Sequence, residues 1–227
     1  MAEFSESLDA LWSVQKHDAV IVRQREQLAK LERENQAEHA KVEAAKAALE
    51  ERKSKLRKLQ GEHKELEQEL LRLDARVKQL EAQGTEAGME AAAKQRNKID
   101  ELETGGLDLL TAVTIAEQEV QVAETELKQK QEIQAAKLKA NADVAAAAQQ
   151  LIEATEAART TAAALVTPKL LAVYDEVNAR NPGKALAKIA EGFCSACSGE
   201  INTQLAMQVR ARKEILRCPH CTRILDA

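Results

Sequence analysis

Aromatic side chains are almost missing from this chain. Trp12, Tyr174, Phe4 and Phe193 are the whole set, which makes 2% of 227 residues. Because aromatic side chains supply much of the buried area of compact cores, an ordinary globular fold of this length is not expected. Charged residues make up 31% of the chain, and Ala, Glu, Lys, Leu, Gln and Arg dominate the rest. This composition is typical of long helices.

Long apolar runs are also missing. No stretch of 18 or more uncharged apolar residues occurs, so no membrane-spanning helix is predicted. The first residues, MAEFSESLDALWSVQ, lack the basic region, apolar stretch and cleavage site of a signal peptide. We therefore expect a cytoplasmic protein without membrane insertion. In that compartment thiols stay reduced, and clustered cysteines are more often metal ligands than disulfides.

Proline is missing from the first 166 residues, so nothing stops a helix outright there. Apolar residues recur in steps of three and four along this segment and follow one heptad register. The pattern breaks at QGTEAGM, where Gly84 and Gly88 flank a short polar turn, and then resumes. The pattern predicts two long helices that fold back on each other near residues 84–88.

The register of the two helices supports an antiparallel pairing. If the chain folds back, residues that share a layer have numbers that sum to a constant. Leu49 with Ala123 and Leu56 with Ala116 both sum to 172, and half of 172 falls between Gly84 and Gly88. Residues 1–166 are therefore predicted to form a long antiparallel two-helix coiled-coil hairpin.

One glycine pair interrupts the second predicted helix. Gly105 and Gly106 each weaken a helix interior by about 1 kcal/mol relative to alanine. We expect a local kink or a frayed patch at this point.

A second segment begins at residue 167. Thr167 and Pro168 are suited to the start of a new, shorter helix, and the turn residues of ARNPGK are suited to its end. Beyond this turn, apolar residues at strand-like spacing surround the cysteines. Residues 167–227 are therefore predicted to form a small α+β module, in a chain that is mainly α.

All four cysteines lie in this module, in the pattern C-x2-C-x20-C-x2-C: Cys194, Cys197, Cys218 and Cys221. Two residues between the members of a pair allow a tight turn to point both sulfurs inward. Two such turns supply the four thiolates that one tetrahedral Zn²⁺ prefers. A closed four-thiolate shell leaves no position for a catalytic water, so the predicted zinc ion is structural.

A redox function is the main alternative for these cysteines. The sequence CPHC, residues 218–221, also occurs in oxidising thiol–disulfide enzymes, where a helix that follows the motif lowers the thiol pKa. Only six residues follow Cys221, and the alternative leaves the first cysteine pair unexplained. His220 stands beside a full set of thiols and is expected to be exposed or to lie outside the metal ligands.

Basic residues cluster next to the second cysteine pair. Residues 1–166 hold 24 Lys and Arg against 31 Asp and Glu, which is not the charge balance of a nucleic-acid-binding segment. The C-terminal module reverses this balance, with 9 Lys and Arg against 6 Asp and Glu. Its candidates for contact with phosphate, on an expected strand-and-loop face, are Arg210, Arg212, Lys213, Arg217 and Arg223.

The order of these features resembles the bacterial coiled-coil and C4-type zinc-ribbon family. The resemblance rests on the helical hairpin, the helix with LLAVYDEV, the GFCSAC turn and the terminal RCPHCTRIL. It implies one zinc ion on the four cysteines and an adaptor function. In flagellated bacteria some members of the family are tied to flagellar gene expression through the sigma-54 factor and flagellin messenger RNA. Related proteins in other bacteria engage secretion or transcription partners. Thr222 stands where the family usually has glycine in its second turn.

Two functions remain open at this point. The first is a non-enzymatic adaptor that binds partner proteins through the coiled coil and the zinc ribbon. The alternative is an RNA- or DNA-binding regulator that uses the basic face of the ribbon. No nucleophile–base pair or phosphate-binding glycine loop stands out in the sequence, so an enzyme is not expected.

Overall fold

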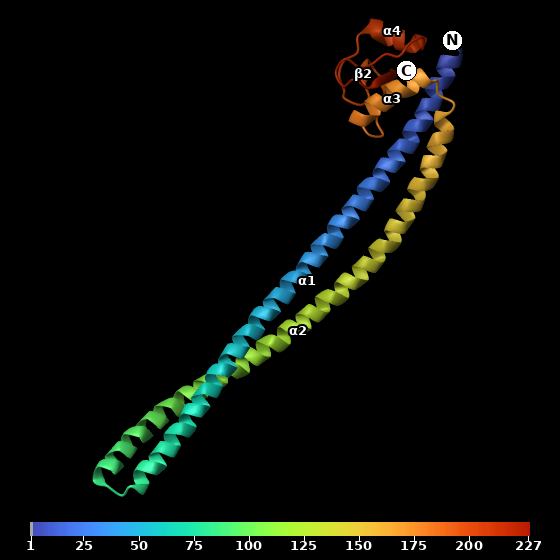
Figure 1. Ribbon diagram of the computed structural model, residues 1–227. Helices are drawn as coiled ribbons and strands as arrows, with labels where there is room; N and C mark the ends of the chain where they lie inside the picture. Colours follow the sequence, from blue (N-terminus) through green and yellow to red (C-terminus); the bar gives the residue numbers. More distant parts are fainter. Residues whose placement is uncertain (1) are drawn as a thin grey trace. The chain divides into compact units, whose positions relative to one another are not determined.

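The computed structural model describes residues 2–227 and contains two long helices followed by a small mixed module (Figure 1). Helix α1 spans Ala2–Ala82, α2 spans Glu86–Ala163 and α3 spans Pro168–Arg180. The module continues with strands β1 (Leu186–Ala190) and β2 (Phe193–Cys194), helix α4 (Thr203–Ala211) and strand β3 (Ile224–Asp226). The predicted fold class, a helical hairpin followed by a small α+β module, is confirmed.

The chain packs into two compact units. One is the hairpin unit, residues 35–138, and the other is the base unit, which comprises the described residues 2–34 together with 139–227. The expected domain boundary between residues 166 and 167 lies in the connection from α2 to α3. The module that follows this boundary packs in one unit with the first turns of α1 and the last turns of α2.

The turn of the hairpin lies where the glycines predicted it. Gly84 adopts a positive φ of 65°, which costs glycine little because it has no Cβ. The hydroxyl of Thr85 then accepts a hydrogen bond from the Gly88 N–H at 3.1 Å, at the start of α2. These local interactions reverse the chain between the two helices.

The interior of the hairpin unit consists of small apolar clusters. Leu49 packs with Val120 and Ala123, as the predicted register requires. Val77 and Leu80 form another cluster with Ala92, close to the turn. The clusters repeat along the helices, so each layer is buried by local contacts.

The glycine pair in α2 does not fray the helix. Gly105 and Gly106 lie within a continuous helix, and the expected frayed patch is absent. A Cβ on Gly106 would lie 3.2 Å from a methyl group of Leu66, whereas a Cβ on Gly105 would meet no described atom of α1 within 4 Å. The missing side chain of Gly106 thus makes room for Leu66 of α1, and this packing compensates for the low helix propensity of glycine.

The core of the base unit joins both long helices to the module. Tyr174 of α3 and Leu11 of α1 are completely buried at its centre. The other buried members of this core are Leu8, Val14, Ala162, Val166, Leu170, Val177, Ala185, Leu186 and Ile224. Strand β1 lies in the middle of a three-stranded sheet, antiparallel to β2 and parallel to β3.

Helix α4 was not predicted from the sequence, which suggested a strand and loop in this region. Asn202 caps the helix, because its side-chain oxygen accepts a hydrogen bond from the Leu205 N–H at 2.7 Å. Leu205 and Val209 lie one helical turn apart and pack against the second core of the module, around Cys194. Nine residues form too few turns for a strong helical pattern to stand out.

A buried carboxylate on α1 holds α2 and α3 in place. Asp18 is 7% exposed, and Arg159 donates to its two oxygens at 2.6 and 3.3 Å. The Tyr174 hydroxyl donates to Asp18 at 2.8 Å and the Asn178 amide donates at 3.3 Å. Burial, together with the hydrogen bond to Asp18, raises the pKa of Tyr174 above its ordinary value, so the phenol remains a donor.

A second buried carboxylate ties the end of the chain to α1. Asp226 is 1% exposed and receives two hydrogen bonds from the Arg212 guanidinium at 2.9 and 2.8 Å. The Trp12 indole donates to it at 2.7 Å, and the same guanidinium reaches Asp9 at 3.0 Å and Ser5 at 3.1 Å. The C-terminal strand, the end of α4 and the start of α1 therefore share one polar network.

Candidate metal centre

Two equivalent turns present the four cysteines. In the first, the Cys194 carbonyl accepts a hydrogen bond from the Ser198 N–H at 2.8 Å; in the second, the Cys218 carbonyl accepts from the Thr222 N–H at 2.9 Å. Ser198 and Thr222 both have positive φ values, 58° and 62°. The sharp reversal at these residues turns both sulfurs of each pair to the same side.

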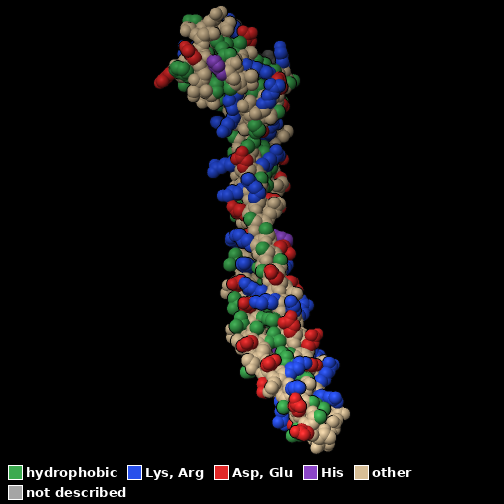
Figure 2. Space-filling model, turned by 90° about the vertical axis from the view of Figure 1, so that its left-hand side faces the viewer, with side chains coloured by type: hydrophobic (Ala, Val, Ile, Leu, Met, Phe, Trp, Pro, Cys, Tyr) green, Lys and Arg blue, Asp and Glu red, His purple; other side chains and the backbone are tan. Residues whose placement is uncertain are grey.

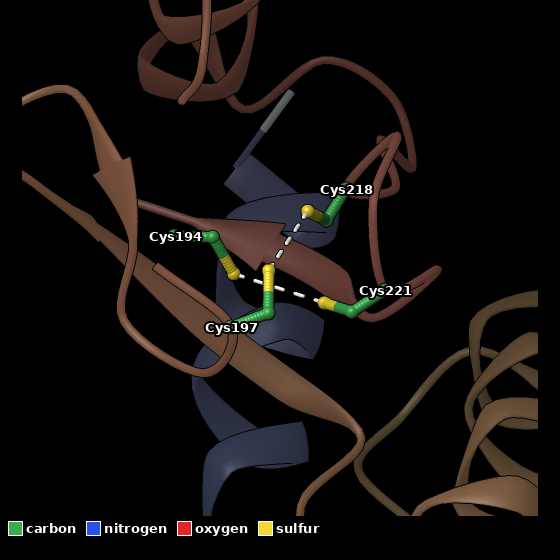
Figure 3. Close-up of side chains that lie close together, drawn as sticks. All are labelled: Cys194, Cys197, Cys218 and Cys221. Carbon is green, nitrogen blue, oxygen red and sulfur yellow. Dashed lines mark hydrogen bonds between the residues drawn. The ribbon is translucent and has the colours of Figure 1, made fainter. Parts of the chain in front are cut away.

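The four sulfurs converge on one point (Figure 3). The Sγ atoms of Cys194 and Cys221 are 3.8 Å apart, as are those of Cys197 and Cys218, and all four lie within 4.8 Å of one another. Thiolates bound to a tetrahedral zinc ion at about 2.3 Å are separated by about 3.8 Å. The donor set and its spacing therefore fit one structural zinc ion, as predicted.

The thiols differ in their affinity for protons. Burial opposes ionisation of Cys221, but hydrogen bonds from Arg223 and from neighbouring thiols outweigh it and lower the pKa to about 6. At Cys197 a backbone hydrogen bond from Gly199 favours the thiolate, but desolvation and the other three thiols raise the pKa to about 12. A metal ion that binds all four sulfurs must displace protons from this cluster.

His220 lies outside the set of four ligands. Its ring packs over Gly199 of the first turn, where a Cβ would lie 2.4 Å from a ring carbon. One ring nitrogen is 3.0 Å from the Glu200 carbonyl oxygen. His220 thus contacts the first cysteine turn from outside the metal ligands, as predicted.

The structure does not support the alternative that the cysteines have a redox function. The residues that follow Cys221 form a turn and then strand β3, which pairs with β1. The helix that would lower the pKa of a catalytic thiol is not found among these residues. Both cysteine pairs instead contribute to one cluster.

Residues 194–225 match the family model of the C4-type zinc ribbon domain. This part of the C-terminal module is therefore similar to a C4-type zinc ribbon. The match covers both cysteine turns, α4 and most of β3. The fit of the four sulfurs to zinc gives the same assignment from geometry alone.

Two solved structures share the fold of the whole chain. CT398 from Chlamydia trachomatis has a TM-score of 0.89 at 18% sequence identity, and the comparison covers 100% of this chain and 99% of that one. The HP0958 protein from Helicobacter pylori has a TM-score of 0.62 at 13% identity, with 97% of each chain covered. No curated protein has a significantly similar sequence. At these identities the likeness establishes the fold alone.

Two of the five basic candidates for nucleic-acid contact take part in internal ion pairs. Arg212 binds the buried Asp226 and also Asp9, at 2.8 and 3.0 Å. Arg217 donates two hydrogen bonds to Glu176 of α3, at 2.8 and 3.4 Å. Both guanidinium groups are already engaged in holding the module together.

The other three basic candidates do not share one surface element. Arg210 and Lys213 are exposed at the end of α4, where none of the described carboxylates pairs with them. Arg223 is half-buried next to the second cysteine turn and donates to the Lys184 carbonyl at 2.7 Å. On the face shown in Figure 2, basic and acidic side chains are mixed along the long helices. Nucleic-acid contact by these residues stays a prediction.

Among residues 2–227, no helix combines the length and apolar character that crossing a membrane requires.

Proposed function

We propose that this protein is a non-enzymatic adaptor of the cytoplasm, which binds a partner protein through helix α2 of the hairpin unit. The observation that supports the proposal most strongly is an apolar stripe on α2 that the hairpin does not use. Leu107, Ile115 and Val122 are 68%, 50% and 54% exposed. Their spacing of eight and seven residues places them on one side of the helix.

Helix α2 itself carries charge of one sign along this stripe, although Lys53 and Lys55 of α1 pair with two of its carboxylates, Glu124 and Glu119. Residues 99–127 hold eight Asp and Glu and no Lys, Arg or His. Asp108, Glu119 and Glu126 are spaced by 11 and 7 residues and form a row on one side of the stripe, and Glu117 and Glu124 lie on the other. We call this surface, residues 99–127 with the three exposed aliphatic side chains, the acidic face of α2.

The partner that fits the acidic face is a basic amphipathic helix. Its apolar side would cover Leu107, Ile115 and Val122. Its Lys or Arg side chains would pair with the flanking carboxylates that form no ion pair with a described residue, Asp108 and Glu126 on one side and Glu117 on the other. Helices dock on apolar grooves in this way through side chains one and two turns apart. By resemblance, transcription, flagellar or secretion components are the first partners to test.

The structure offers less support for nucleic acid as the main ligand. Arg212 and Arg217 are committed to ion pairs with Asp226 and Glu176. An acidic α2 surface would repel phosphates over its length. The sharper test of the alternative is charge reversal at Arg210 and Lys213 alone, because reversal at the paired arginines would disturb the fold as well.

A direct test compares binding of a labelled helical peptide of leucine and lysine with that of its leucine and glutamate counterpart. The lysine peptide should bind the parent protein, and L107Q/I115Q/V122Q should weaken its binding by at least about tenfold, since each lost apolar contact contributes about 1 kcal/mol. The matched control is L71Q/M89Q, which removes equally exposed apolar residues outside the acidic face.

Affinity capture from cytosol treated with RNase provides the second part of the test. The partner should be retained by the parent and by the control, and lost by the stripe variant. Equal capture by all three proteins would contradict the assignment of the acidic face. Loss of every captured protein on RNase treatment would favour the nucleic-acid alternative. Sedimentation of the parent alone shows whether a second copy of the chain occupies the stripe instead.

A further inference from the structure

The base unit contains a second candidate binding site, with charge opposite to that of the acidic face. A cavity of about 630 Å³ opens between α1 and the loop that joins α3 to β1. Its charged lining residues are Arg23, Glu26, Arg180, Lys184 and Arg223, and Pro182 supplies part of the apolar wall. We call this site the basic cavity.

The loop is held against α1 in a way that shapes the cavity. Gly183 has a positive φ of 70°, and a Cβ on it would lie 2.8 Å from the Cα of Ala19. The Gly183 N–H donates to the Asn178 side chain at 2.8 Å. Only glycine allows the loop to approach α1 this closely, so the lining residues come from a defined backbone rather than from a loose segment.

One of the cations is positioned by the zinc ribbon itself. Arg223 follows the second cysteine turn, and its Nε donates to the Lys184 carbonyl at 2.7 Å. The same side chain also hydrogen-bonds Cys221, and the N–H groups of the guanidinium that remain can donate to another acceptor. Zinc binding and the arrangement of the cavity are therefore connected through Arg223.

The lining of the cavity has more cationic than anionic side chains. Four cations face one carboxylate, Glu26. Arg23 and Lys184 form no ion pair with any described residue, and Arg180 has only a distant partner in Glu176, at 3.7 Å. In the same unit, Arg212 and Arg217 are by contrast paired with Asp226 and Glu176. A concentration of unpaired cations in a concave site attracts an anionic ligand.

We propose that the basic cavity binds an acidic peptide segment of a partner protein. Carboxylates of the peptide would accept from Arg23, Lys184 and Arg223. Glu26 discriminates between peptide and nucleic acid, because a phosphodiester backbone offers only acceptors and would be repelled, whereas a peptide also offers N–H donors. None of the described lining residues is aromatic, so the cavity provides no platform for stacking of bases.

The proposal extends the adaptor function but does not depend on the acidic face. The two surfaces have opposite charge and share no residue. A protein that carries both can hold two partners of different chemistry. A failure of one proposal can be distinguished from a failure of the other, because the basic helical peptide tests binding to α2 and an acidic peptide tests binding to the cavity.

The experiment measures fluorescence anisotropy of a labelled peptide of alternating glutamate and alanine on the full zinc-loaded chain. The parent should bind it, with affinity that falls as salt is added. R23E/K184E should raise the Kd by at least about tenfold, because two attractive contacts become repulsive. The control R210E/K139E makes the same change of charge at exposed cations outside the cavity and should bind as the parent does.

Two readouts keep a folding defect separate from a binding defect. R23E/K184E should keep its zinc and melt at the same temperature as the parent or higher, since the reversals relieve repulsion between unpaired cations. Equal binding of the peptide by all three proteins, or no binding by the parent, would overturn the proposal. So would an oligoribonucleotide that binds the parent more tightly than the peptide and is lost in R23E/K184E, since this result would make the cavity a nucleic-acid site.

Discussion

The hairpin unit and the base unit are stabilised by different kinds of contact. In the hairpin unit, ion pairs such as Lys53–Glu124 and Lys55–Glu119 join side chains that are roughly half exposed, and such pairs contribute little. In the base unit, Asp18 and Asp226 are buried and each has at least two hydrogen-bond donors. Many weak interactions of the same kind stabilise the hairpin unit, whereas a few buried polar interactions stabilise the base unit.

This difference determines how each unit responds to change. Loss of one layer from a repeating interior affects mainly its neighbours, because each layer is buried locally. Loss of a buried ion pair or of the metal removes a contact that nothing else replaces. We therefore expect large effects in the base unit and small ones in the hairpin unit.

Zinc removal should have the largest effect. Binding energy of order 10 kcal/mol is available from a structural zinc site, and the module has few large apolar residues to replace it. A strong chelator, or Cys218→Ser, should unfold residues 186–227 while most of the helical signal from α1 and α2 remains. Limited proteolysis and far-ultraviolet circular dichroism measure the two parts separately.

The control for this experiment is the chelated sample after zinc is restored. Recovery of protease resistance shows that the metal was responsible. Parallel loss of the module and of the long helices on chelation would contradict the separation between the two units.

Asp226→Asn should have the next largest effect, about 2–3 kcal/mol, because it removes the buried charged partner of Arg212 and leaves the half-buried guanidinium with only the exposed Asp9. Glu124→Gln in the hairpin unit serves as the matched change and should cost no more than about 0.5 kcal/mol. Urea unfolding of both variants gives the two free energies. Similar values for the two variants would remove the contrast between the units.

The effect of Asp226→Asn should also depend on pH. Burial raises the pKa of Asp226, but the bonds from Arg212 and Trp12 outweigh it and hold the pKa below its ordinary value of 3.8. A lowered pKa means that the ion pair stabilises the fold above pH 3.8 and that this stability is lost as the pH falls through the folded value. The difference between parent and variant should stay constant from neutral pH down to about 5 and shrink below about 4.

The smallest effect is a gain in stability from Thr222→Gly. Thr222 adopts a positive φ of 62°, which is unfavourable for a β-branched residue, and glycine removes this strain. We expect a gain of about 1 kcal/mol, seen as a higher melting temperature of the zinc-loaded protein. Ser198→Gly at the equivalent place in the first turn should gain less, because serine is not β-branched.

Structural features that depend on residue spacing in the sequence were predicted well. The turn near residue 86, the layer that contains Leu49 and Ala123, and the four zinc ligands all follow from spacing, which local chemistry determines. Helix α4 was missed because nine residues between two cysteine turns carry too little pattern. Fraying at Gly105 and Gly106, one of the two expectations for this glycine pair, was wrong, because it left out the contact of Leu66 of the other helix with Gly106.

The sequence by itself determined that the chain folds back, that four thiols meet, and where α1, α2 and α3 begin and end to within a few residues. Only the tertiary structure decided which charges are paired: Arg212 and Arg217 inside the module, and Arg23 and Lys184 in an open cavity without a partner. The physical reason is the separation along the sequence of the residues that interact. Helix periodicity and cysteine turns act over a few residues, whereas Arg212 meets Asp9 and Arg223 meets Lys184 only after the whole base unit has packed.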